Sequence, residues 1–183
     1  MKRIASTFAV LAALAAASST SSAQSTKPVS LGVSVGASIP VSDLGNLYNS
    51  GYNGTVSLGF NSDGSPLGFR IDGMYNSMSA QDSHPGLADL KISSANANLV
   101  YALPGTGIRP YLIGGAGVYG IKQDFPNAQT DTKLGLNGGI GASFPLSGFN
   151  TFVEARVHHV LNYNIDPNFT PVTFIPVTFG ISF

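Results

Sequence analysis

The sequence contains no cysteine and no tryptophan, and charged side chains make up only 10% of it. An ordinary soluble domain is about 25% charged, so this composition is unusual for a surface that faces water. Without cysteine, the chain is not one of the small secreted domains that disulfide bonds hold together. The fold must therefore rest on burial of apolar surface and on backbone hydrogen bonds.

Basic charge and long apolar runs are also scarce. Nine Lys and Arg residues balance nine Asp and Glu residues, and the formal net charge is zero. A nucleic-acid-binding domain needs a basic patch or stripe, and none is present. After residue 23, no apolar run approaches the ~18 residues that indicate a transmembrane helix. The sequence therefore excludes nucleic acid as a partner and excludes membrane crossing by helices.

The N-terminus has the pattern of a secretory signal peptide. Lys2 and Arg3 precede a largely apolar run over residues 4–17, and small polar residues follow. This run is shorter than the ~20 residues that span hydrocarbon, whereas a charged start, an apolar centre and small residues at the end are typical of a cleaved signal. We expect cleavage between Ala23 and Gln24.

Cleavage there divides the chain into a signal peptide over 1–23 and a single exported domain over 24–183. It also removes two of the nine basic residues, so that seven remain against nine acidic ones. The mature domain is then slightly acidic, poor in charge and free of disulfides.

The end of the chain alternates apolar side chains with small or polar ones. Period-two alternation is typical of a β-strand with one apolar face, and the same pattern recurs along the domain. We expect strands over residues 29–39, 52–61, 67–76, 94–103, 109–121, 134–144, 151–158 and 174–183. The fourth of these is weak, and Pro176 interrupts the eighth, where a closed ladder has no free edge.

The connections between these strands alternate in length, because they are long after the first, third, fifth and seventh strands and short after the others. Bacterial outer-membrane barrels have an even strand number, short periplasmic turns and longer external loops. Strands of ~10 residues are long enough for a tilted crossing, and closure leaves no unpaired edge in lipid. The sequence predicts an all-β, eight-stranded antiparallel up-and-down transmembrane β-barrel in the bacterial outer membrane.

Alternation alone does not decide which way the fifth strand faces, because glycine occupies many of its positions. We expect Tyr111, Ile113 and Tyr119 to face outward, as large apolar side chains do on the other strands.

Four segments resemble a known family: Arg-Pro-Tyr-Leu at 109–112, Gly-Leu-Asn-Gly-Gly-Ile-Gly at 135–141, Phe-Val-Glu-Ala-Arg-Val-His at 152–158, and the last nine residues at 175–183. Together they resemble the small outer-membrane β-barrel family related to the transmembrane domain of outer membrane protein A. The resemblance implies an eight-stranded barrel, export across the inner membrane, and folding by the barrel assembly machinery. Larger members continue into a domain that binds peptidoglycan, a property that the resemblance does not carry over here.

The resemblance also assigns a role to the last strand, because the assembly machinery reads a C-terminal strand that ends in Phe. The residues that would form this assembly signal here are Val177, Phe179, Gly180, Ile181 and Phe183.

Charged residues fall on the inner faces of two expected strands that lie opposite each other. Arg70 and Asp72 belong to the third strand, and Glu154 and Arg156 belong to the seventh, with His158 on the same face. An eight-stranded barrel is filled by side chains, and charges removed from water persist only when they are paired. We expect these five residues to form a salt-bridged plug; the alternative is a gated path for ions, or a proton relay through His158.

No catalytic or metal site stands out. Asp82, His84 and Asp89 could gather around a metal, but polar residues are ordinary in a loop. Some small outer-membrane barrels modify lipids with an outward Ser and His, for which Ser93 and His159 are the best candidates, although their spacing supports no catalytic pair. We expect no enzymatic activity and no metal.

A glycine pattern gives no stronger signal. Gly115, Gly117 and Gly120 match G-x-G-x-x-G, which cradles a pyrophosphate only where a helix follows. A polar loop follows here, so we expect these glycines to thin the barrel wall and we expect no cofactor.

The sequence therefore predicts a structural or interacting outer-membrane protein, monomeric, with a filled lumen and four external loops. Its expected partners are the outer-membrane lipids and, during biogenesis, the barrel assembly machinery; it does not indicate what the loops bind. Two alternatives stay open. One is a narrow ion-conducting pore, and the other is a soluble secreted barrel that holds a small apolar ligand and turns its apolar face inward.

Overall fold

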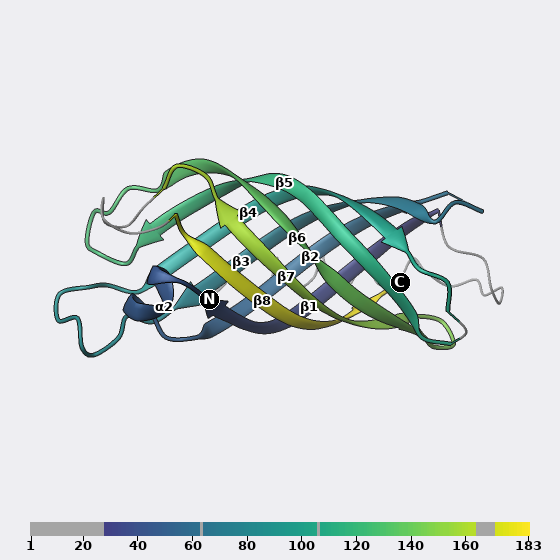
Figure 1. Cartoon of the computed structure of the whole chain (residues 1–183), viewed down its shortest axis with the longest axis horizontal. Coiled ribbons are helices and arrows are strands. Elements are labelled where there is room, and N and C mark those ends of the chain that lie inside the picture. Colours follow the sequence, from purple (N-terminus) through teal and green to yellow (C-terminus); the bar gives the residue numbers. More distant parts are fainter. Residues whose placement is uncertain (1–27, 63, 106, 164–170) are drawn as a thin grey trace, which may run out of the picture.

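The computed structural model describes residues 28–62, 64–105, 107–163 and 171–183. In these ranges eight strands form one closed barrel, in which every strand pairs antiparallel with its sequence neighbours and the first strand closes against the last (Figure 1). The predicted fold class is confirmed. The expected cleavage site between Ala23 and Gln24 lies outside the described residues.

The elements are β1 (Val29–Pro40), α2 (Asp43–Leu47), β2 (Gly51–Asn61), β3 (Leu67–Met78), β4 (Leu90–Ala102), β5 (Arg109–Gln123), β6 (Asp131–Pro145), β7 (Asn150–Val160) and β8 (Thr173–Ser182). The weak fourth strand is present and begins before its expected start. Among the described residues, no helix is long and apolar enough to cross a membrane.

The connections alternate as predicted. The described residues of the long ones, 41–50, 79–89, 124–130, 161–163 and 171–172, lie at one end of the barrel, here called the loop end, and include α2 (Figure 1). The described residues of the short ones, 62, 64–66, 103–105, 107–108 and 146–149, lie at the opposite end, the turn end. The third long connection is shorter than expected because β5 and β6 both extend into it.

The outer face of the barrel is apolar and the inner face is largely polar. Val35 and Leu134 are 69% and 66% exposed, whereas Asp72 and Asn76 are fully buried. This placement is the one expected of a barrel surrounded by lipid. It contradicts the soluble alternative, which would have put the apolar side chains inside.

The facing of β5 is the reverse of the one predicted. Tyr111, Ile113 and Tyr119 point inward and are almost fully buried, whereas Leu112 and Val118 point outward. Leu112 and Val118 therefore face lipid, and the two tyrosines of this strand occupy the lumen.

Glycines on the neighbouring strand give these tyrosines their room. Gly141 of β6 lies beside Tyr111, and a Cβ atom there would overlap the tyrosine ring; a Cβ atom at Gly135 would lie 2.6 Å from the ring of Tyr119. Close side-chain approach is one of the few reasons to keep glycine in a strand. The inward tyrosines are therefore matched to glycines on β6.

Pro176 lies within β8, opposite Ser38 of β1. On its other side, the ladder between β7 and β8 omits the pairs that would involve Arg156 and Val157, and it resumes where His158 lies opposite Phe174. Proline has no N–H group to donate to a neighbouring strand. Pro176 lies where the ladder between β7 and β8 is interrupted.

Candidate functional site in the lumen

The charged residues of β3 and β7 meet across the lumen. Arg70 Nη2 lies 2.8 Å from Glu154 Oε1, and Arg70 Nε lies 2.9 Å from Asp72 Oδ1. Arg156 Nη1 lies 2.7 Å from Asp72 Oδ2, and Arg156 Nε lies 2.9 Å from Glu154 Oε1. Each arginine therefore contacts both carboxylates, and we call these four residues the lumen ion network.

The network is balanced in charge and almost completely removed from water. The side chain of Arg70 is 14% exposed, and the other three are at most 3% exposed. The contact between Arg70 Nε and Asp72 Oδ1 is an ion pair without hydrogen-bond alignment, whereas Arg70 Nη2 donates to Asp72 Oδ2 at 3.2 Å. Two positive charges against two negative ones leave no net buried charge, which is the condition for burying such groups.

Neutral side chains complete the network. The Tyr111 hydroxyl donates to Glu154 Oε2 at 2.7 Å, and Asn98 Nδ2 donates to Asp72 Oδ2 at 3.0 Å. Gly139 lies directly opposite Arg156, where a Cβ atom would stand 2.7 Å from Arg156 Cγ. Sequence reasoning missed Tyr111 because it placed that residue on the outer face.

His158 lies one level closer to the loop end than the network. Among the described residues no hydrogen bond or ion pair joins it to the four charged side chains; its Nδ1 atom lies 2.8 Å from the Tyr119 hydroxyl, and its Nε2 atom has no partner. The imidazole stacks on the Phe174 ring at 5.1 Å and 17°. His158 therefore belongs with aromatic residues of the lumen, whereas the sequence had placed it among the charges.

A layer of amides and hydroxyls also lines the lumen. Asn53 Nδ2 donates to Asn76 Oδ1 at 2.8 Å, and Asn96 Nδ2 donates to Ser94 Oγ at 2.9 Å. All four of these side chains are buried. Polar filling of the inner face was expected from the alternation of the strands.

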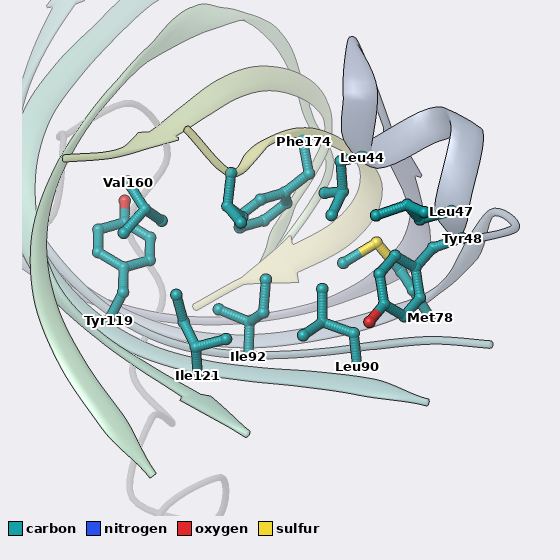
Figure 2. Close-up of a cluster of buried hydrophobic side chains, with 11 residues drawn as sticks. Leu44, Leu47, Tyr48, Met78, Leu90, Ile92, Tyr119, Ile121, Val160 and Phe174 are labelled. Carbon is teal, nitrogen blue, oxygen red and sulfur yellow. The ribbon is translucent and has the colours of Figure 1, made fainter. Parts of the chain in front are cut away.

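The loop end of the lumen is apolar, which the sequence analysis did not predict. Figure 2 shows these side chains converging from α2 and from the barrel wall. The buried cluster, which we call the apolar plug, consists of Leu44, Leu47, Tyr48, Met78, Leu90, Ile92, Tyr119, Ile121, Val160, Val172 and Phe174. Met78 and Val160 lie beyond the expected ends of their strands, and Leu90 and Ile92 lie before the expected start of theirs.

Helix α2 and its flanking residue fix the first long loop to the second. Tyr48 forms an isolated β-bridge with Ala80 and accepts a hydrogen bond at its hydroxyl from Gln123 Nε2 at 3.2 Å. Gln81 Nε2 donates to the Gly45 carbonyl at 2.9 Å. Burial raises the pKa of the Tyr48 hydroxyl. The loop end is therefore a packed cap attached to the plug.

The last strand closes the barrel to its final residue. Phe183 exchanges two backbone hydrogen bonds with Leu31, at 2.8 and 3.2 Å, and its ring lies 6.4 Å from that of Phe149. Val177 and Phe179 face outward, and Ile181 shares their side of the strand. Gly180 faces inward, where a Cβ atom would stand 2.5 Å from the Phe152 ring.

The Ser and His candidates for lipid chemistry are not brought together. Ser93 lies on β4 and His159 on β7, with β5 and β6 between them. His159 Nδ1 lies 2.8 Å from Thr173 Oγ1, but that hydroxyl donates its single proton to the Pro171 carbonyl at 3.1 Å. The side chain that contacts the His159 imidazole is therefore Thr173 of the adjacent strand, and not Ser93.

The other candidates do not form sites either. In the described part of the chain no group of three or more His, Cys, Asp or Glu side chains could hold a metal ion, and Asp82, His84 and Asp89 form no such group. Asp89 Oδ1 instead accepts a hydrogen bond from the backbone of Ala80. The glycines of 115–120 lie inside β5, without the helix that a phosphate-binding loop requires.

An apolar outer face, a polar lumen and closure of eight strands define the class of protein, and a family model described as outer membrane protein beta-barrel domain matches residues 7–183. The chain belongs to this family. Members of the outer membrane protein beta-barrel domain family reside in the outer membrane, and this chain is assigned to that location.

Solved structures show the same fold. Neisserial surface protein A superposes with a TM-score of 0.69 at 18% identity, over 87% of this chain and 98% of that one. Ail, the attachment invasion locus protein of Yersinia pestis, gives 0.53 at 16%, over 85% and 97%. The outer membrane enzyme PagL gives 0.50 at 18%, over 84% and 97%. A comparison with curated protein sequences gives no match. At these identities the likeness concerns the fold alone.

Proposed function

We propose that this protein is a structural and interacting outer-membrane barrel with a closed lumen, and that it acts through the surface of its loop end. The observation that carries the proposal is the lumen ion network, in which Arg156 and Asp72 meet at 2.7 Å across the barrel. Removing one partner of a buried ion pair costs about 3–5 kcal/mol. An ion that crossed the lumen would have to separate these contacts.

The apolar plug supports the same conclusion independently. It fills the lumen between the network and the loop end with side chains such as Met78, Leu90 and Phe174, each of which is fully buried. An apolar constriction offers a passing ion no replacement for its hydration shell. Two barriers of different chemistry therefore lie in series.

The external loops are the part of such a barrel that is open to partners, because loops at the long-connection end face away from the cell. The cap built from 41–50 and 79–89 is held in place by Tyr48 and Gln81, so a partner would meet a preformed surface. We propose a non-enzymatic role, since the outward Ser93 and His159 lie on separate strands. Export by the signal peptide over 1–23 is part of the proposal.

Single-channel recording in a planar bilayer tests the closed lumen. The folded, purified barrel is expected to give no steady ohmic conductance, whereas regular conductance steps from the intact protein would favour the narrow-pore alternative. An Asp72→Ala and Glu154→Ala double variant serves as the comparison, because it removes both acceptors of the network. A conductance that appears only in this variant would identify the network, and not the apolar plug, as the barrier that closes the lumen.

A further inference from the structure

One region of the outer face is polar. Tyr52, Ser77, Lys91 and Lys122 lie directly opposite one another on the consecutive strands β2, β3, β4 and β5. The pair formed by Tyr75 and Ser93 lies beside them, one step closer to the turn end. We call these six residues the outer polar patch.

The alternation of the strands places the patch on the outer surface. Lys91 stands between Leu90 and Ile92, which are fully buried in the apolar plug, so its own side chain points the opposite way. Lys122 follows the equally buried Ile121. The same argument applies to Ser77, Tyr75 and Ser93, whose neighbours along each strand are buried, and Tyr52 is 61% exposed beside the buried Asn53.

The patch lies at the boundary of the lipid-facing band. Toward the turn end, the outward positions of β4 and β5 become apolar, with Ala95 opposite Val118 and Ala97 opposite Ala116. The rings of Tyr52 and Tyr75 lie 6.4 Å apart, and tyrosines are typical of the level of the lipid head groups. The lysines therefore stand at the level of the head groups.

The charges of the patch are only partly compensated. Like charges directly opposite on two strands repel each other, as Lys91 and Lys122 do here. Asp124 accepts a hydrogen bond from Lys91 Nζ at 2.6 Å, and this contact lowers the pKa of its carboxyl. Within the described ranges Lys122 has no ion pair. Lys122 also lowers the pKa of the Asp124 carboxyl, so two ammonium groups share this one carboxylate, surrounded by hydroxyl groups.

We propose that the outer polar patch binds the phosphate group of a lipid in the outer leaflet. Lysine ammonium groups and hydroxyls donate to phosphate oxygens, and basic residues beside a membrane attract anionic head groups. Gly120, opposite Ser93, adds no side chain that would cover this surface. The inference rests on the outer-membrane location of the chain and is independent of whether the lumen conducts.

Native mass spectrometry of the folded barrel in a neutral detergent tests the site, with dioleoyl phosphatidic acid as the probe and dioleoyl phosphatidylcholine as the comparison lipid. Phosphatidic acid is expected to bind in preference. Because each lysine near a membrane surface contributes about a fivefold effect, Lys122→Gln should weaken binding about fivefold and the Lys91→Gln, Lys122→Gln double variant about 25-fold. The gel mobility of each unboiled variant reports that it is folded.

Two further variants separate this site from general attraction of charge. Lys133→Gln removes a lysine at the same end of the barrel. The alternation of β6 places Lys133 on the inner side of the strand, in line with the buried Gly135 and Asn137, so this variant should leave lipid binding unchanged. Asp124→Asn frees Lys91 from its partner and should strengthen binding. Equal binding of both lipids, or equal losses in the Lys122 and Lys133 variants, would overturn the proposal. So would full displacement of the lipid by equimolar inorganic phosphate, because the anion alone would then be the ligand.

Discussion

Arg156 on β7 places its Nη1 atom 2.7 Å from Asp72 Oδ2 on β3, so that one ion pair spans the lumen between strands on opposite sides of the barrel. Backbone pairing alone fixes each strand relative to its two neighbours. This contact joins two strands that share no backbone hydrogen bond. Asp72 and Glu154 each form ion pairs with both arginines. The arrangement of the strands is therefore fixed twice, by backbone pairing between neighbours and by ion pairs across the lumen.

Removing one carboxylate from the network should destabilise the folded barrel. Glu154→Gln leaves two buried arginines against a single carboxylate, and Glu154→Lys adds a third positive charge. An uncompensated buried charge costs about 3–5 kcal/mol, so the temperature at which the unboiled band disappears from a detergent gel should fall, and more so for the lysine variant.

Asp124→Asn is the matched control for this prediction, because it also removes one carboxylate from an ion pair, but from an exposed one. Exposed pairs contribute little to stability, and its unfolding temperature should match that of the unmodified protein. If Glu154→Gln and Asp124→Asn unfold at the same temperature, the network has no structural role.

Gly141 should resist substitution because Tyr111 occupies the space beside it. An alanine Cβ would overlap the tyrosine ring and displace the hydroxyl that donates to Glu154; overpacking of this kind costs about 1–3 kcal/mol. Gly138→Ala is the control on the same strand, since the nearest atom to its Cβ would be the Ile113 carbonyl oxygen at 3.9 Å. Heat resistance should fall for the first variant and stay unchanged for the second.

Most of the fold could be predicted from the alternation of the strands. The alternation of β1, with Val29 and Val35 outward and Ser34 and Ser38 inward, is regular because a small polar inner face meets a lipid-facing outer one. Period and turn signals were therefore enough for the strand number, the closure and the opposition of β3 to β7.

The facing of β5 could not be predicted in that way. Tyr111 has an apolar ring and a polar hydroxyl, so it suits either face of the barrel. Whether it faces inward depends on whether a glycine lies opposite it on the next strand. That pairing is a property of the register between β5 and β6. The apolar plug was missed for a related reason, since Leu44 and Leu47 belong to a short helix in a segment that looks like a turn.

The apolar plug should hold the cap of external loops without being needed for the barrel itself. Leu47 is 7% exposed, and truncation of a buried leucine to alanine costs about 2–5 kcal/mol. Because α2 is attached to the barrel by a loop on each side, this loss should open 41–50 and 79–89 locally. Hydrogen exchange should then increase in those two segments and stay slow in the strands.

Leu146→Ala serves as the control, because Leu146 is 53% exposed in a short turn at the opposite end; it should leave exchange in both loops unchanged. Faster exchange throughout β1 to β8 in Leu47→Ala would contradict the prediction and would make the plug part of the core on which the barrel depends.

Phe183 should be needed for assembly more than for stability. Its backbone pairs with Leu31 whatever its side chain is, whereas its ring contacts Phe149. If the assembly machinery recognises the terminal aromatic residue, Phe183→Ala should reduce the amount of folded barrel in isolated outer membranes. Phe149→Ala removes the same ring contact and leaves the terminal residue in place, so it should assemble normally. Equal reductions in the two variants would instead attribute the effect to the lost packing between the rings. The intact mass of the assembled protein, with Gln24 expected as the first residue, tests the signal peptide in the same preparation.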